Sequence, residues 1–225
     1  MKKKKSFFLW VLLFIFLTTY NFDFTANIEN SIFPIREIEF TGIKNSDENK
    51  IKKKLDEFKG KSIILISTKK LKETIKDFDF IREIKIKKIY PGKIKVEINE
   101  FKPLAIFMND NGKYLLLLDA GRIAKYKEVS DSDSLTPVYG KGAEKNFYIL
   151  HASLEELGLN KELIKKFDYF DINRWDIVLK DDKIIKLPVD GYEESLKRFL
   201  SIYKKENFSN FQVFDFRIKG QLILK

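Results

Sequence analysis

The apolar positions between residues 35 and 100 change their spacing along the chain. In 35–43 and 83–100 apolar and polar residues alternate, which is typical of half-buried strands. Between these segments the apolar residues return every three or four positions, which is typical of amphipathic helices. The residues of the two helical runs are Ile51, Leu55 and Phe58, and then Leu71, Ile75 and Phe78. With a turn at Pro91-Gly92, the pattern predicts strand, helix, helix and hairpin in that order.

Each predicted helix has a polar start signal. Ser46 or Asp47 precedes the first helical run, and Ser67 or Thr68 precedes the second. Short polar side chains at this position accept hydrogen bonds from free backbone N–H groups of the first turn. We therefore expect both helices to begin just after these residues.

Lysines occupy the polar positions of the predicted hairpin. Lys85, Lys87, Lys93 and Lys95 alternate with isoleucine and valine, so they project from the opposite face of the strands. If both helices cover the apolar face, the lysines keep the other face soluble. The alternative is that they attract anionic lipid headgroups, with ~1 kcal/mol from each basic residue near such a surface.

The N-terminus joins a basic stretch to an apolar one. Four lysines follow Met1, and the 17 residues of 6–22 carry no charge. As a helix rising about 1.5 Å per residue, 6–22 nearly crosses a hydrocarbon core of about 30 Å. The lysines predict that 1–5 is a cytoplasmic tail and that the chain beyond about residue 25 is extracytoplasmic. The anchor residues would include Phe7, Trp10, Leu13, Phe16 and Tyr20.

A cleaved secretory signal is the competing interpretation of this segment. Signal peptidase prefers two small residues at A-x-A spacing, and Phe24 occupies one of these positions in the first candidate, Phe24-Thr25-Ala26. The sequence therefore favours an uncleaved, single-pass anchor in the cell membrane.

Charge is spread unevenly along the chain. The net charge is +10, of which Lys2 to Lys5 supply +4. Residues 23–102 hold 19 basic and 14 acidic residues, whereas 103–225 hold 20 and 19. Because the bulk of the chain is expected outside the cytoplasm, nucleic acid is not an expected partner. The absence of cysteine excludes disulfides and thiolate metal sites.

The second half of the chain shows further strands and one clear helix. Segments 114–126 and 175–188 each read as strand, turn and strand. Segment 191–203 has helical spacing, with Leu196, Phe199, Leu200 and Tyr203 inward, and 211–225 closes the chain as an alternating strand pattern.

Several of these motifs resemble the FtsQ/DivIB family of bacterial cell-division proteins. The first unit resembles that family's POTRA module, with Tyr90-Pro91 at the turn, Glu100 closing the strand and Pro103-Leu104-Ala105 at the exit. In the second half, Asp119 to Gly121 resembles the family's Asp-x-Gly hairpin, 135–143 its Leu-Pro-apolar-x-Gly loop, and 214–217 its apolar-Asp-apolar-Arg signature.

The resemblance implies an α+β protein in four parts. These are a cytoplasmic tail (1–5), a transmembrane helix (6–22), a POTRA-like β-α-α-β-β module (33–103) and a mixed β-rich domain with an antiparallel sheet and flanking helices (104–225).

Catalytic chemistry is not expected. The single histidine, His151, lies two residues before Ser153 in an apparent helix, and no G-x-S-x-G motif is present. One histidine and no cysteine leave no set of N/S ligands for a metal, and the acidic clusters at 131–134 and 181–182 lack the calcium-loop pattern. No glycine-rich phosphate loop occurs, so we expect no cofactor and no small-molecule substrate.

The remaining function class is binding, and 211–224 is the candidate site. A terminal strand offers unpaired backbone groups to which a partner strand can add, although the same strand could be internal or protected from pairing. The resemblance implies that this late strand docks small bitopic division proteins similar to FtsB/DivIC and FtsL. The candidate binding residues are Val213, Phe214, Phe216, Arg217, Ile218, Lys219 and Leu222.

The sequence thus predicts a non-catalytic membrane scaffold at the division septum. Two alternatives remain open: a POTRA-bearing accessory protein of secretion or envelope assembly, and a secreted hydrolase with an unrecognised site.

Overall fold

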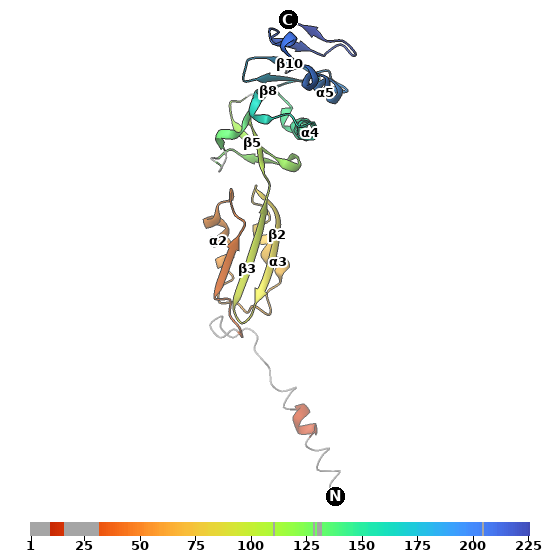
Figure 1. Ribbon diagram of the computed structural model, residues 1–225. Coiled ribbons are helices and arrows are strands. Elements are labelled where there is room, and N and C mark those ends of the chain that lie inside the picture. Colours follow the sequence, from red (N-terminus) through yellow and green to blue (C-terminus); the bar gives the residue numbers. More distant parts are fainter. Residues whose placement is uncertain (1–9, 16–31, 110, 128, 130–131, 204) are drawn as a thin grey trace.

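The structure, a computed structural model, describes residues 10–15, 32–109, 111–127, 129, 132–203 and 205–225 of the chain (Figure 1). Within these residues a three-stranded sheet is followed by a nine-stranded sheet. Figure 1 shows the two sheets end to end, with the smaller one nearer the N-terminus. The combination of sheets and packed helices confirms the α+β class.

The first unit has the predicted order of elements. These are β1 (Glu37–Thr41), α2 (Glu48–Asp56), α3 (Thr68–Ile75), β2 (Ile81–Ile89) and β3 (Lys93–Glu100). β3 lies in the centre of the sheet, antiparallel to β2 and parallel to β1. A parallel pair needs a long connection, which the two helices and β2 supply here.

Both helices of this unit start at one of the predicted caps. The Asp47 carboxylate accepts a hydrogen bond of 3.1 Å from the Lys50 N–H, and the Ser67 hydroxyl accepts one of 3.2 Å from the Lys69 N–H. The helices pack into the same core as the sheet, so both cover one of its faces. This core includes Ile38, Ile51, Leu55, Leu71, Ile75, Ile84, Ile94, Val96 and Ile98.

The other face of this sheet carries the alternating lysines. Lys93 Nζ lies 3.2 Å from Glu37 Oε1 and 2.9 Å from Glu39 Oε2, and Lys85 Nζ lies 3.8 Å from Glu83 Oε2. Ion pairs between exposed groups contribute only about 0–1 kcal/mol each to stability, but they offset the charge of the lysines. This face is therefore a solvated mixture of both signs.

Glu100, the last residue of β3, fastens the loop that precedes α2. Its carboxylate accepts backbone hydrogen bonds from Lys44 at 3.2 Å, Asn45 at 2.7 Å and Ser46 at 2.8 Å. A carboxylate bonded to several backbone N–H groups makes strong, charge-assisted bonds. Glu100 thus connects the end of the sheet to the start of the helical layer.

The second unit is built on the nine-stranded sheet. Its strands are β4 (Pro103–Met108), β5 (Tyr114–Leu118), β6 (Ile123–Lys125), β7 (Thr136–Tyr139), β8 (Ile164–Phe170), β9 (Arg174–Leu179), β10 (Ile184–Lys186), β11 (Val213–Asp215) and β12 (Ile223–Leu224). Its helices are α4 (Ala143–Glu156) and α5 (Tyr192–Tyr203). The strand order is β12-β11-β10-β9-β8-β7-β4-β5-β6.

This sheet is mixed, whereas the sequence predicted an antiparallel one. The pairs β4–β7, β7–β8 and β10–β11 are parallel. For β7–β8 and β10–β11 the reason is the placement of the helices: α4 connects β7 to β8 and α5 connects β10 to β11, and such crossovers return the chain in the same direction. For β4–β7 the connection runs through β5 and β6. Both helices pack into one core, on one face of the sheet, through Phe147, Leu150, Leu154, Leu196 and Phe199.

The segment 135–143, predicted as a loop, contains a strand near the middle of the sheet. β7 pairs with β4 along its whole length and with β8 from Val138 onward. Gly140 ends the strand with φ +103°, and a side chain there would overlap the backbone carbonyl of Tyr169. The glycine therefore allows a close approach of two backbones.

A small apolar cluster joins the two units. Phe80, which directly precedes β2, packs with Leu116, Leu118, Ala124 and Val129 of the second unit. Phe80 is only 4% exposed, so its ring is almost completely buried.

Polar contacts surround this cluster. Asp119 accepts a hydrogen bond of 3.0 Å from the Lys102 N–H and forms an ion pair with Arg82. The Lys127 ammonium donates to the backbone carbonyl of Asn45. Contacts on both sides of Phe80 therefore tie the first unit to the β5–β6 end of the second.

Candidate partner-binding edge

β12, the strand nearest the C-terminus, forms one edge of the nine-stranded sheet. It pairs with β11, and no further strand lies beyond it in the part of the chain that the structure describes. The segment 211–224, predicted as one terminal strand, is instead two short strands joined by a turn. β11 is internal, because it pairs with β10 on one side and β12 on the other. The edge position therefore belongs to β12.

The direction of the free backbone groups on β12 follows from its pairing. Val213 and Lys225 exchange two backbone hydrogen bonds, with N···O distances of 3.0 and 3.1 Å. In an antiparallel pair, residues that exchange bonds alternate with residues whose N–H and C=O point away from the partner. Leu224 accordingly directs its backbone groups away from β11, toward the position of an added strand.

The turn before β12 is held by local bonds. The Gln221 N–H donates to the Ile218 carbonyl at 3.0 Å, and Gly220 adopts φ +77°. From α5, the Arg198 guanidinium donates to the Gly220 carbonyl at 3.3 Å. These bonds fix the approach of the chain to the edge.

Asp215 and Arg217 form the strongest polar contact of this region. Arg217 Nη2 lies 2.6 Å from Asp215 Oδ2, and Arg217 Nε lies 2.9 Å from Oδ1. The Arg217 backbone N–H also donates to Oδ1 at 3.1 Å. These hydrogen bonds lower the pKa of Asp215, and the carboxylate in turn raises the pKa of Arg217.

The predicted binding residues divide into buried and accessible ones. Phe214 and Phe216 lie in the core, and the Phe214 ring packs edge-on against Phe199 of α5, with centroids 5.1 Å apart. Their side chains hold β11 in place and do not reach the surface. The accessible members of the set are Val213 and Leu222, which are half-buried, and Arg217, Ile218 and Lys219, which are exposed.

A row of charged residues, missed at the level of sequence, leads across the sheet to this edge. Asp168 of β8, Asp176 of β9, Lys186 of β10 and Asp215 of β11 are successive partners in register. Asp176 lies between two buried apolar neighbours in its strand, so period-two spacing places it on the face opposite the core. This alternation was the signal that could have identified the row.

Asp176 and Asp215 are both buried, but Asp176 lacks the close arginine fork that Asp215 has. Asp176 is 7% exposed, and burial raises its pKa, although Arg174 acts in the opposite direction with Nη1 3.6 Å from Asp176 Oδ1. Buried carboxylates destabilise a fold unless they are fully paired, so this position carries a cost.

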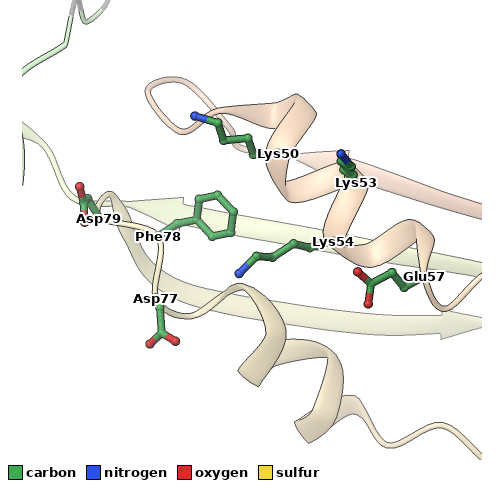
Figure 2. A pocket seen from close by; sticks show the side chains of 7 residues that line it. All are labelled: Lys50, Lys53, Lys54, Glu57, Asp77, Phe78 and Asp79. Atoms are coloured by element: carbon green, nitrogen blue, oxygen red, sulfur yellow. The ribbon is translucent and has the colours of Figure 1, made fainter.

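A groove of about 480 Å³ lies on the first unit between α2 and the segment after α3 (Figure 2). Figure 2 shows Lys54 extending along it toward Phe78, whose ring centroid is 5.4 Å from Lys54 Nζ. Three lysines and three carboxylates line the groove, so it has no net charge. The lining residues are Lys50, Lys53, Lys54, Glu57, Asp77, Phe78 and Asp79.

The predicted membrane anchor lies largely outside the described residues. Phe7, Phe16 and Tyr20 are among the residues not described, whereas Trp10 and Leu13 lie in a short helix at 10–15 with exposed side chains. Among the described residues, no helix combines the length and the apolar character that a bilayer crossing requires.

The side chains of His151 and Ser153, the two residues considered for catalysis, lie in different environments on α4. Residues two apart on a helix lie on different faces. The His151 ring is 5% exposed and packs against Phe147 at 5.7 Å, and burial lowers its pKa. Ser153 lies instead near the Tyr192 hydroxyl of α5, whose pKa it lowers against the raising effect of burial. A serine nucleophile would need the histidine within hydrogen-bond reach, so this pair does not form that arrangement.

Known families and relatives match both units in the same order. The FtsQ-type POTRA domain matches residues 33–101, and the C-terminal domain of cell division protein FtsQ/DivIB matches residues 105–217. Neither matching domain is described as an enzyme.

Relatives named cell division protein FtsQ align with most of the chain. The protein of Rickettsia bellii is 28% identical over 198 residues, which cover 86% of this chain and 72% of the relative. The protein of Rickettsia conorii is 26% identical over 93% of this chain and 78% of the relative. That of Bartonella bacilliformis is 25% identical over 77% of this chain and 56% of the relative. The chain therefore belongs to the FtsQ/DivIB family of cell division proteins.

Proposed function

We propose that the protein is a non-catalytic, bitopic scaffold of the bacterial divisome that binds small bitopic division proteins outside the cytoplasm. In this proposal 1–5 is cytoplasmic, 6–22 spans the cell membrane, 33–103 is the POTRA-like module and 104–225 is the β domain. Family membership supports the role in division, and the apolar segment after the basic tail supports the anchor.

The partner adds a strand to β12. The observation that carries this proposal is the outward direction of the Leu224 backbone at the edge of the nine-stranded sheet. Main-chain hydrogen bonds supply affinity in such complexes, and side chains at alternate positions supply specificity. The proposed partners are proteins similar to FtsB/DivIC and FtsL.

Positive charge at the edge favours an acidic partner segment. Lys219 lies exposed in the turn before β12, and Lys225 follows the strand directly. Arg217 already holds Asp215, so it positions the turn more than it offers a free charge. Acidic side chains that flank the added strand would pair with these lysines and speed association.

A proline substitution tests the strand addition. Leu224→Pro removes one outward N–H and breaks no bond to β11, and proline is tolerated at such edge positions. Leu224→Ala controls for the half-buried side chain, and Ile223→Pro removes an inward N–H and loosens β12 itself. We expect the full-length Leu224→Pro protein to fold but to lose copurification with its FtsB/DivIC-like partner, whereas Leu224→Ala retains it. Full retention by Leu224→Pro would contradict the proposal.

Localisation tests the division role independently. A fluorescent protein fused to the cytoplasmic N-terminus of the full chain should form a band at midcell before constriction. An even signal around the envelope would contradict the septal role and favour an accessory protein of envelope assembly.

A further inference from the structure

Three loops form the end of the first unit that lies away from the nine-stranded sheet (Figure 1). Together with the adjoining ends of β1, β2 and β3 they comprise residues 32–37, 58–67 and 87–93, and we call this surface the tip. It includes Ile32 and the turn between β2 and β3.

Backbone bonds hold the three loops together. The Ile63 N–H donates to the Phe33 carbonyl at 2.9 Å, which joins the first loop to the second. The Arg36 N–H donates to the Gly92 carbonyl at 2.8 Å, which joins the first loop to the third. The three segments of the tip are therefore held in fixed positions relative to one another.

Large apolar side chains are exposed on all three loops. Leu65 is 65% exposed and Tyr90 is 60% exposed. The full set is Ile32, Phe33, Ile64, Leu65, Ile89 and Tyr90. Single exposed apolar residues are common, but a group gathered at one end of a small unit indicates a contact surface.

Positive charge is concentrated on the same loops. They hold six basic residues and one acidic residue, a surplus of +5. Lys59 and Lys93 pair with Asp56 and Glu39 just outside the tip, and counting both acids still leaves +3. The rest of the unit, at 38–57, 68–86 and 94–102, holds 13 basic and 11 acidic residues, so the surplus lies mainly at the tip.

The tip is also close to the proposed anchor along the chain. From Phe22, where 6–22 ends, ten residues lead to Ile32. Ten extended residues span at most about 36 Å, so the tip cannot move far from the bilayer if the anchor is inserted. Exposed apolar and aromatic groups on the same segments as several lysines have the composition of surfaces that bind at a membrane interface.

From these observations we infer that the tip docks on the anionic surface of the bilayer that holds the anchor, with Leu65 and Tyr90 entering the headgroup region. This inference rests on the anchor of the proposed function. Docking of the tip would fix the orientation of the first unit relative to the membrane. β12 would then lie at the far end of the molecule, directed away from the bilayer (Figure 1).

A single-cysteine label can test this contact, because the chain has no cysteine of its own. Leu65→Cys in the full-length protein is labelled with a polarity-sensitive fluorophore and reconstituted into vesicles containing anionic phosphatidylglycerol and brominated lipids. Ile172→Cys is the matched control, because Ile172 is an equally exposed (64%) apolar residue of the second unit. Flotation of the vesicles reports insertion of the anchor separately.

We expect the label at residue 65 to shift its emission to shorter wavelength and to be quenched by the brominated lipid, whereas the label at residue 172 shows neither effect. Vesicles of neutral phosphatidylcholine should reduce the quenching at residue 65. Lys61→Ala should lower the ratio of docked to undocked tips by up to about fivefold, the contribution of one basic residue near an anionic surface.

Two outcomes would overturn the inference and can be told apart. If the chain floats with the vesicles but the label at residue 65 behaves like that at residue 172, the anchor stands and the docking is wrong. If the chain does not float with the vesicles, the anchor itself fails and the docking fails with it.

Discussion

Arg217 forms a forked ion pair with Asp215, two residues earlier in the chain, through Nε and Nη2. The side chain of Asp215 is 6% exposed and that of Arg217 is 47% exposed, so the pair joins the buried end of β11 to the turn that leads to the edge strand. Asp215 and Arg217 are the two polar residues of the apolar-Asp-apolar-Arg signature at 214–217. The ion pair between them explains why an aspartate and an arginine stand two residues apart there.

Removal of the arginine should weaken the fold. Arg217→Ala leaves a nearly buried carboxylate without its charged donors, and we expect a loss of about 1.5–3 kcal/mol in the free energy of unfolding. Arg217→Lys should lose less, because an ammonium keeps the charge but not the fork. Urea denaturation measures both, and an unchanged midpoint for Arg217→Ala would contradict this role.

Asp215 and Asp176 should affect stability with opposite dependence on pH. The lowered pKa of Asp215 means that its contribution is fully present above the ordinary aspartate pKa of 3.8 and is lost as the pH falls through the folded value. Asp215→Asn should therefore destabilise at neutral pH. The difference from the unmodified chain should shrink below about pH 4.

Asp176 has a raised pKa because it is buried, so its ionised form lowers the free energy of unfolding. This destabilisation is fully present above the raised folded value and disappears as the pH falls below 3.8. Asp176→Asn should consequently raise the unfolding midpoint at neutral pH and have little effect in acid. A destabilised Asp176→Asn variant at pH 7 would show that the pairing with Arg174 outweighs burial.

Glu100 should be important for the first unit. Glu100→Ala leaves three backbone N–H groups of the loop at 44–46 without their acceptor, and we expect a loss of about 2–3 kcal/mol in the free energy of unfolding. Glu97→Ala, an exposed position on the same strand, is the control and should change stability by less than about 0.5 kcal/mol. If both substitutions changed the free energy of unfolding equally, Glu100 would not stabilise the loop at 44–46 as proposed.

Phe80 should govern the connection between the units. Phe80→Ala empties the centre of the joining cluster, and we expect a loss of about 3–5 kcal/mol together with wider scatter in the distance between the two sheets. Spin labels on the two units can measure this distance. Tyr126→Ala, an exposed position at the same junction, should leave the distance distribution unchanged.

Local patterns predicted the first unit well. The hairpin of β2 and β3 forms with Ile84 opposite Ile98 and Ile86 opposite Val96, as the alternation on each side of Pro91-Gly92 indicates. The helices follow from their apolar spacing and caps, since both signals lie within a few residues of each other in the chain.

Elements that depend on distant partners were not predicted. β7 contains Pro137 and is followed by Gly140, which indicate a loop locally, but pairing with β4 and β8 makes the segment a strand. β12 is only two residues long, so no periodicity could separate it from β11. The burial of Phe214 was unpredicted for the same reason, because its ring packs against Phe199 of α5, a distant element in the sequence.

Backbone amide exchange at β12 tests the central claim most directly. In the protein alone the Leu224 N–H, which points away from β11, should exchange fast, and the Lys225 N–H, bonded to Val213, should exchange slowly. With the FtsB/DivIC-like partner bound, strand addition should protect the Leu224 N–H as well. A bound partner that leaves Leu224 exchange unchanged would contradict docking at this edge.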